Sequence, residues 1–347
     1  MERKTKSGGR PQSGEGADKP TDAATTGGNS EAPTSQFQMA SEEFWTAARM
    51  EEAEPYPLPE ISESQLKDQA EKMAEEMRKS AAGAEGGVAL GGRPDATGPT
   101  DDTQPTATTG GYDYPAPFTR LEVADEKQFP YATVGKIFFT QNGHNYVGSA
   151  ASIGNYSFFT AGHCVHAGDN KSTSWSTNLV FVPAYHDGGA PFGQWRATRL
   201  WTRTVWMQNG NPNGFSEDMG GGVLLPLNGR KISQAVGWLG FAWNWSKYQH
   251  WHSVGYPQAA PFNGLRMFDV QASFAYDGNA PGVKPMGIGN DMTGGCSGGP
   301  WIWQFGTGNY LNGVNSYRRT ANPQELFSPY FGNPAKSLFD VIVAATP

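Results

Sequence analysis

From about residue 133 onward, short runs of β-branched and aromatic residues alternate with clusters of Asn, Gly and Pro. The clearest runs span 133–140, 178–186, 199–206, 222–227 and 265–276. Short strands at regular spacing between turn residues are typical of a β-sandwich or barrel. One later helical pattern spans 334–344, with Leu338, Val341 and Ile342 on one face. The pattern therefore predicts an all-β body that ends in a helix.

The first third of the chain has another pattern. Residues 1–40 and 81–111 mix Gly, Thr, Ser, Pro, Ala and Asp without periodicity, which predicts disordered or linker sequence. Between them, Ser62 and Gln65 match a capping box and apolar residues follow at helical spacing, so we expect a helix over about 62–80. This helix is interpreted as part of a propeptide or as a partner-binding helix. A solvated helix inside a flexible tail stays open as the alternative.

Charge and aromatic content divide the chain at the same place. The net charge of −7 consists of −9 over residues 1–110 and +2 over residues 111–347, and 39 of the 43 aromatic residues lie in the second part. The first part has too few large side chains to offset its ordering entropy alone, whereas the second is long enough for a full core. We expect a low-complexity acidic extension over 1–115 and one domain over 116–347.

Composition also excludes several classes of protein. The body carries no basic cluster, which argues against nucleic acid as a partner. The sequence contains neither an apolar run of about 18 residues nor an apolar signal-peptide core, so no membrane partner is predicted. Two cysteines cannot build a disulfide framework or a cysteine zinc site, and His250 and His252 lack a third ligand. No metal and no cofactor are predicted, and the protein is expected to be a monomer.

One serine lies in a context that suggests activation. Ser297 is surrounded by four glycines in the segment GGCSGGP. Glycine permits strained backbone and close approach of a substrate carbonyl, and two convergent N–H donors beside a nucleophile would form an oxyanion hole. The segment also fits G-x-S-x-G of the α/β-hydrolases, but that fold needs a histidine after the serine. The last histidine is His252, so that fold is excluded.

The general base must therefore precede Ser297. His163 stands in FFTAGHCV, where an apolar strand end runs into small residues. A serine hydroxyl needs such a base within hydrogen-bond reach, and the base needs a carboxylate that fixes its tautomer. Asp218 is the strongest acid candidate because it lies directly before the apolar strand at 222–227, a position that could aim it inward.

These segments resemble a known family. TAGHC, an Asp before an apolar strand, and GGCSGGP, in the order His–Asp–Ser, are similar to the chymotrypsin-fold serine peptidases. TVGKIFFTQNG, DMTGGCSGGPW, GVNSY and SPYFG agree with their bacterial and fungal branch, which includes the glutamyl endopeptidases. The resemblance covers about residues 128–347. It implies two six-stranded antiparallel β-barrels with a C-terminal helix, a peptide or protein substrate, and secretion.

The resemblance also implies roles for individual residues. Ser297 would be the nucleophile, His163 the general base and then acid, and Asp218 the orienting carboxylate. The N–H groups of Gly295 and Ser297 would form the oxyanion hole. Ser316 would place a hydroxyl near the aspartate and line the substrate site. The implied reaction is acyl transfer from a peptide bond to Ser297, followed by attack of water. A catalytically silent binding protein of the same fold, acting through its N-terminal extension, is the alternative.

The sequence departs from the family at the substrate-selecting positions. Glutamyl endopeptidases carry a histidine and a small hydroxyl residue where this chain has Asn315 and Met292, so glutamate preference is not supported. Asp291 stands where a trypsin-like site selects basic residues, but Arg318, directly after Tyr317, could neutralise it. Asp291 could equally cap the following turn. Asp291, Met292, Asn315, Ser316, Tyr317 and Arg318 are therefore candidate substrate-binding residues without a defined preference.

The two cysteines also stand apart from the family pattern. Cys296 occupies the place of the aspartate that usually precedes the nucleophile, and Cys164 lacks its usual partner because Gly148 stands at that position. A bridge between Cys164 and Cys296 would need converging Cβ vectors, and each side chain is expected to point away from the site. We expect two buried thiols.

Overall fold

The computed structural model describes residues 27–34, 38–65, 87–89 and 116–347. Its first large unit is a closed ring of six strands in the order β10-β11-β8-β7-β6-β9, with β9 pairing back to β10. All of these pairings are antiparallel. The strands are β6 (Val134–Gln141), β7 (His144–Ser152), β8 (Ser157–Thr160), β9 (Thr177–Pro183), β10 (Trp195–Arg203) and β11 (Gly220–Leu224).

The second unit is a longer sheet that curls back on itself. Its order is β18-β19-β15-β14-β13-β16-β17-β12, with β5 paired to β14. The N–H of Ser316 donates to the carbonyl of Phe327 over 2.9 Å, which joins the chain after β17 to β19. The strands are β5 (Thr119–Glu122), β12 (Gly240–Trp243), β13 (His250–Gly255), β14 (Phe268–Asp277), β15 (Met286–Gly289), β16 (Pro300–Trp303), β17 (Tyr310–Val314), β18 (Tyr317–Arg319) and β19 (Asn322–Ser328).

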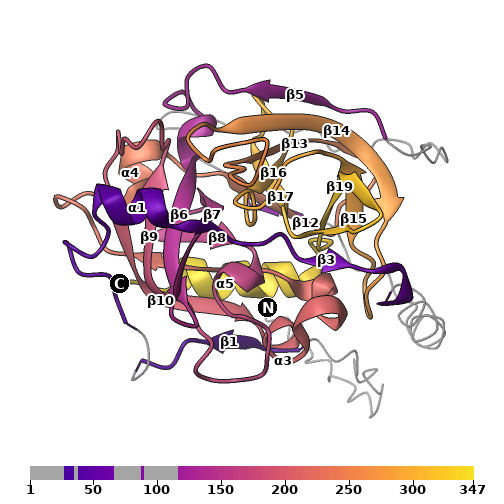
Figure 1. Cartoon of the computed structure of the whole chain (residues 1–347), viewed down its shortest axis with the longest axis horizontal. Coiled ribbons are helices and arrows are strands. Elements are labelled where there is room, and N and C mark those ends of the chain that lie inside the picture. Colours follow the sequence, from indigo (N-terminus) through magenta and orange to yellow (C-terminus); the bar gives the residue numbers. More distant parts are fainter. Residues whose placement is uncertain (1–26, 35–37, 66–86, 90–115) are drawn as a thin grey trace, which may run out of the picture.

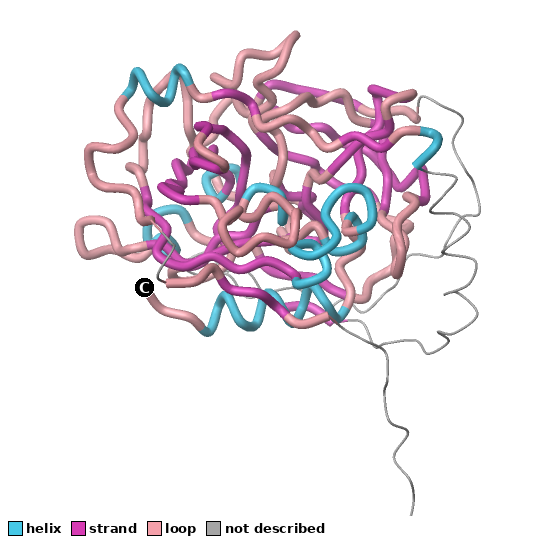
Figure 2. The backbone as a smooth tube through the Cα atoms, turned by 60° about the horizontal axis from the view of Figure 1, so that its bottom comes forward, coloured by secondary structure: helices cyan, strands magenta, loops and turns pink. Residues whose placement is uncertain are grey.

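Helices are short and few among the strands, as Figure 2 shows. The predicted C-terminal helix is confirmed as α5 (Asn333–Ala344), which buries Leu338 and Ile342 and leaves Val341 partly exposed. The others are α1 (Ala47–Glu52), α3 (Thr204–Asn213), α4 (Ile232–Val236) and the 3-10 turns η1 (Tyr131–Thr133), η2 (Gly162–Cys164) and η3 (Phe215–Glu217). Among the described helices, none has the length and apolar character that a membrane span needs. The all-β prediction with a C-terminal helix is confirmed.

The five predicted strands are all present with shifted bounds, and two of the shifts have a local cause. In the run predicted at 199–206, strand β10 ends at Arg203 and residues 204–206 belong to helix α3. There the indole of Trp206 donates to the carbonyl of His166. The run at 222–227 begins two residues earlier, at Gly220. A Cβ on Gly222 would lie 2.2 Å from the carbonyl oxygen of Arg199, so the neighbouring strand approaches too closely for a larger residue. A glycine triplet therefore forms a strand that propensity alone does not predict.

The described parts of the acidic extension pack on the body. β1 (Asn29–Glu31) pairs with β10, β2 (Glu54–Pro55) with β7, β3 (Glu60–Ile61) with β18 and β4 (Gly87–Ala89) with β12. Trp45 is buried in the main core and its indole donates to the carbonyl of Asn178. Reading 1–40 and 81–111 as disordered or linker sequence is thus wrong for residues 27–34, 38–40 and 87–89, because strands of the body supply hydrogen-bond partners for them.

The predicted helix at 62–80 is only partly within the described residues. Its first turn is confirmed at 63–65, and the capping box is present: the N–H of Ser62 donates to Gln65 Oε1 over 2.8 Å, and the N–H of Gln65 donates to Ser62 Oγ over 3.4 Å. The rest of that prediction lies outside the described residues. In Figure 1 the chain from α1 to β3 crosses the face of the molecule between the two β units.

Candidate functional site

The turn that carries Ser297 joins β15 to β16 and depends on two glycines. Gly295 has φ +99° and Gly298 has φ +80°, both in the left-handed region that glycine adopts at little cost. Ser149 on β7 fixes the turn from below: its hydroxyl donates to the carbonyl of Gly295 over 3.0 Å, and its N–H donates to the carbonyl of Ser297 over 2.7 Å. In the described part of the chain, no hydrogen bond uses the N–H of Gly295 or Ser297.

His163 lies in η2, directly after β8, and Asp218 lies between η3 and β11. β8 and β11 are paired neighbours, so their ends bring the two residues together. The carboxylate of Asp218 accepts the N–H of His163 over 2.8 Å on Oδ1, and its Oδ2 lies 2.8 Å from His163 Nδ1. Both side chains are buried. This arrangement fixes Nδ1 as the protonated nitrogen and leaves Nε2 as the basic one.

Ser316 completes the shell around the carboxylate. Its hydroxyl donates to Asp218 Oδ2 over 2.6 Å. Three donors therefore converge on one buried carboxylate and satisfy its acceptor oxygens. The sequence placed Ser316 beside the aspartate only through the family resemblance, and the structure brings the two side chains together.

The neighbouring Asp218 changes the titration of His163. Burial by itself lowers the pKa of His163, but the adjacent carboxylate of Asp218 outweighs burial, and the pKa lies above the ordinary 6.5. Because the folded chain binds this proton more tightly than the unfolded chain, the pair's stabilisation is fully present below about pH 6.5. It is lost as the pH rises through the higher folded-state value.

An NMR titration of the imidazole protons tests this balance. We expect the midpoint of His163 to lie above 6.5 in the full chain. In Asp218→Asn the midpoint should fall below that of the parent, since burial then acts without the carboxylate. An unchanged midpoint in Asp218→Asn would show that another group sets the pKa of His163. Chemical shifts of His252, which pairs with Asp269 instead, provide the internal reference.

Two polar atoms of the candidate site are closed off from solvent. His163 Nε2 and Ser297 Oγ are both buried, and neither has a hydrogen-bond partner among the described residues. Tyr56 of the N-terminal extension covers the imidazole: the ring centroids of Tyr56 and His163 lie 5.2 Å apart at 31°. The tyrosine hydroxyl donates to Gln141 Oε1 over 2.8 Å, and Gln141 Nε2 donates to the carbonyl of His163 over 3.2 Å. Tyr56 is therefore coupled to the site through both its ring and its hydroxyl.

Both cysteines are free thiols and buried, which confirms the prediction of two unbridged residues. The thiol of Cys164 lies 3.7 Å from the carbonyl oxygen of Ser297. Burial raises the pKa of Cys296 well above its ordinary value, so this thiol stays protonated and unreactive at neutral pH.

Asn315 and Tyr317 lie inside the body. Asn315 Nδ2 donates to the carbonyl of Cys296 over 3.1 Å, and its Oδ1 accepts hydrogen bonds from Ser253 and Trp301. It therefore supports the turn that carries Ser297 from the protein side. Tyr317 is stacked on Phe215 with ring centroids 3.9 Å apart, and burial raises the pKa of its hydroxyl well above the ordinary value.

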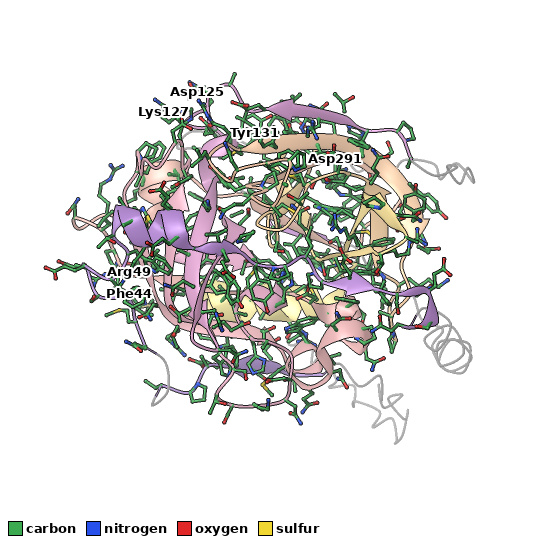
Figure 3. The ribbon with its side chains drawn as sticks, in the orientation of Figure 1. Phe44, Arg49, Asp125, Lys127, Tyr131 and Asp291 are labelled. Carbon is green, nitrogen blue, oxygen red and sulfur yellow. The ribbon has the colours of Figure 1, made fainter. Side chains whose placement is uncertain are left out.

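The three remaining candidates, Met292, Arg318 and Asp291, contact different partners. Met292 belongs to a buried apolar cluster with Leu58, Val270, Cys296 and Leu326. Arg318 pairs with Glu60, with Nη2 2.7 Å from Oε1. Asp291, which is labelled in Figure 3, forms an ion pair with Arg120. The idea that Arg318 neutralises Asp291 is thus wrong, because each side chain has another partner from a distant part of the chain.

Sequence reasoning missed Tyr56, Leu58, Gln141 and Ser149. A signal was present for the first: Tyr56 is one of four aromatic residues among residues 1–110, and Phe44, Trp45 and Tyr56 of that group all pack against the main core. Large apolar side chains in a polar tail need a surface to cover them. Ser149 and Gln141 carry no comparable signal, because they bond to groups elsewhere in the sequence and no local pattern predicts those contacts.

Comparison with solved structures places this geometry among known proteins. Protease Anisep from Arthrobacter nicotinovorans is 36% identical over 65% of this chain and 100% of its own, with a TM-score of 0.59. The thermostable serine protease AL20 from an extremophilic microorganism is 34% identical over 62% of this chain and 98% of its own, with a TM-score of 0.57. A Glu endopeptidase in complex with MPD shares the fold at 16% identity, covering 65% of this chain and 97% of its own, with a TM-score of 0.51.

Other comparisons returned nothing. No family model and no curated protein matches the sequence. Within the described residues, no group of three His, Cys, Asp or Glu side chains is arranged to hold a metal ion.

Proposed function

Because the chain belongs to the chymotrypsin-fold serine peptidases, we propose that it is an active serine endopeptidase that works through Ser297, His163 and Asp218. The observation that carries the proposal is the double contact between Asp218 and His163, 2.8 Å on each carboxylate oxygen. It leaves Nε2 of a buried imidazole as the base, and Ser297 Oγ, in its glycine-bounded turn, is buried as well, with no hydrogen bond joining the two atoms in this structure. The substrate class is a peptide or protein.

In the proposed first step His163 Nε2 takes the hydroxyl proton of Ser297 while Oγ attacks the substrate carbonyl. The N–H groups of Gly295 and Ser297 would stabilise the negative oxygen that forms. His163 then gives the proton to the leaving amine, the C–N bond breaks, and the acyl group stays on Ser297. Water attacks this ester with His163 again as base, which releases the acid and restores the serine. Asp218 orients the imidazole and stabilises its charged form throughout.

A fluorophosphonate tests the proposal directly, since it reacts with activated serines. We expect one label per chain, located on Ser297 by mass spectrometry, and none on the Ser297→Ala chain. Ser172→Ala is the matched control for hydroxyl loss: Ser172 is exposed in the loop before β9, so the label should stay on Ser297. A label on another serine, or equal labelling of Ser297→Ala, would contradict the assignment.

A further inference from the structure

We infer that residues 53–61 occupy the substrate-binding surface of this site in the direction opposite to a substrate and so hold the enzyme closed. The inference rests on the proposed function, because it needs Ser297 to act on peptides. Its occupant is a segment of this same chain, which crosses the molecule between α1 and β3 (Figure 1). The segment reads AEPYPLPEI.

The first observation is that the reactive atoms are covered. Ser297 is 0% exposed and His163 is 1% exposed. Tyr56 lies on the imidazole face, and its carbonyl oxygen is so close to Gly294 that a Cβ there would meet it at 3.0 Å. A substrate carbonyl must reach Ser297 Oγ and both oxyanion donors. Tyr56 stands between them and the solvent.

Two apolar side chains anchor the segment, each in a different buried cluster of the body. Leu58 is 6% exposed and belongs to the buried cluster with Met292 and Cys296. Cys296 directly precedes Ser297 in the sequence. Ile61 is fully buried in a second cluster with Trp206 and Tyr317. Since a peptide bound at this turn would need the space beside Cys296, Leu58 fills the place of a substrate side chain. The lining of that place is aliphatic, aromatic and sulfur-containing, which suits a medium-sized apolar residue.

Backbone hydrogen bonds fix both ends. On one side β2 pairs with β7, and the N–H of Tyr56 donates to the carbonyl of Val147 over 3.0 Å. On the other side the N–H of Arg318 donates to the carbonyl of Pro59 over 3.1 Å, and the N–H of Thr320 donates to Ile61 over 3.2 Å. Strand addition of this kind is how extended peptides bind a sheet edge.

The direction of the segment protects it from cleavage. The leaving amine must lie where His163 can protonate it, so the half of a substrate after the cleaved bond belongs on the side of His163 and β7. The acyl half, which comes first in sequence, belongs toward β18. Residues 53–61 run the other way: β2 comes first and lies on β7, and β3 comes last and lies on β18, with both pairings parallel.

The sequence of the segment suits a rigid occupant. Proline stands at 55, 57 and 59, alternating with Glu54, Tyr56 and Leu58. Each proline has a fixed φ and no N–H, so the segment is extended before it binds and loses little entropy on binding. The residues that keep an N–H include Tyr56, whose N–H is bonded to β7.

The test compares full-length chains by their rate of fluorophosphonate labelling. Leu58→Asp/Ile61→Asp removes both anchors, and Tyr56→Ala is a milder variant in case the double variant folds poorly. Because labelling scales with the fraction of open sites, we expect both to label at least about tenfold faster than wild type. Met39→Asp is the matched control: Met39 lies in the same extension and is already exposed, so its rate should equal that of wild type. Equal rates in wild type and both segment variants would overturn the inference.

A second arm measures binding without catalysis, so that failure of the two proposals can be told apart. The probe is a fluorescent peptide that carries Leu as the residue on the N-terminal side of the bond to be cleaved. Its affinity for the Ser297→Ala chain should rise at least about tenfold when Leu58→Asp/Ile61→Asp is added. Matched peptides with Lys or Glu at that position should bind more weakly. Tighter binding without any labelling would keep the inference and refute the activity. Equally rapid labelling of wild type and the segment variants, together with equal peptide affinities, would support the activity and refute the inference.

Discussion

Asp218→Asn should lower kcat by about 10⁴-fold while KM changes little. Three donors point at this carboxylate, from the backbone and ring of His163 and from the hydroxyl of Ser316. An amide offers only one acceptor oxygen, so its NH₂ group would face a donor. The imidazole then turns to its other tautomer, which places a proton on Nε2 and removes the base that Ser297 needs. Because substrate contacts are untouched, the loss should be confined to kcat.

The measurement is a peptide hydrolysis assay in the Leu58→Asp/Ile61→Asp chain, where the site is expected to be open. Asp269→Asn is the control, since Asp269 is also fully buried and lies 2.8 Å from a histidine, His252, outside the site. Its kcat should stay within about threefold of the parent, as expected for a polar change remote from the reacting groups. A comparable loss in both variants would mean that buried His–Asp pairs act through folding and not through the chemistry.

Local motifs explain how far the site could be predicted from sequence. Ser297 and His163 lie in short glycine- and alanine-rich turns whose geometry depends on neighbours in sequence. Asp218 was found because it immediately precedes an apolar strand, and strand pairing between β8 and β11 brings it to His163. The contact of Asp291 could not be predicted in this way. Its position in the motif is local, but its partner, Arg120, is 171 residues away, and no spacing rule predicts that contact.

The structure of the N-terminal extension was harder to predict because contacts with the body stabilise its described parts. Composition predicts that residues 1–110 have too few large side chains to bury a core of their own. Trp45, Leu58 and Ile61 are nevertheless buried, each against side chains or backbone of the body. A few anchors on an existing surface suffice for a segment that needs no core. Averages over the whole extension conceal such anchors.

Gly298→Ala should destabilise the protein by about 3 kcal/mol or more, from left-handed strain combined with overpacking. Gly298 has φ +80°, and a Cβ there would lie 1.9 Å from Thr160 Oγ1 and 2.5 Å from the carbonyl oxygen of Ser149. Thr160 cannot easily move, because its hydroxyl donates to that same carbonyl over 2.8 Å. The glycine after the nucleophile is thus required by the approach of β7 and β8.

Gly143→Ala separates the two causes, since Gly143 has φ +83° with no heavy atom within 4 Å of an added Cβ. It should cost only about 1–2 kcal/mol, the strain of the left-handed backbone alone. The free energy of unfolding from urea titrations gives both values. Equal losses would mean that backbone strain accounts for Gly298 and that the turn yields to a methyl group. A larger loss for Gly298→Ala, with weakened labelling of Ser297, would show that the contact with β7 and β8 holds the nucleophile turn in place.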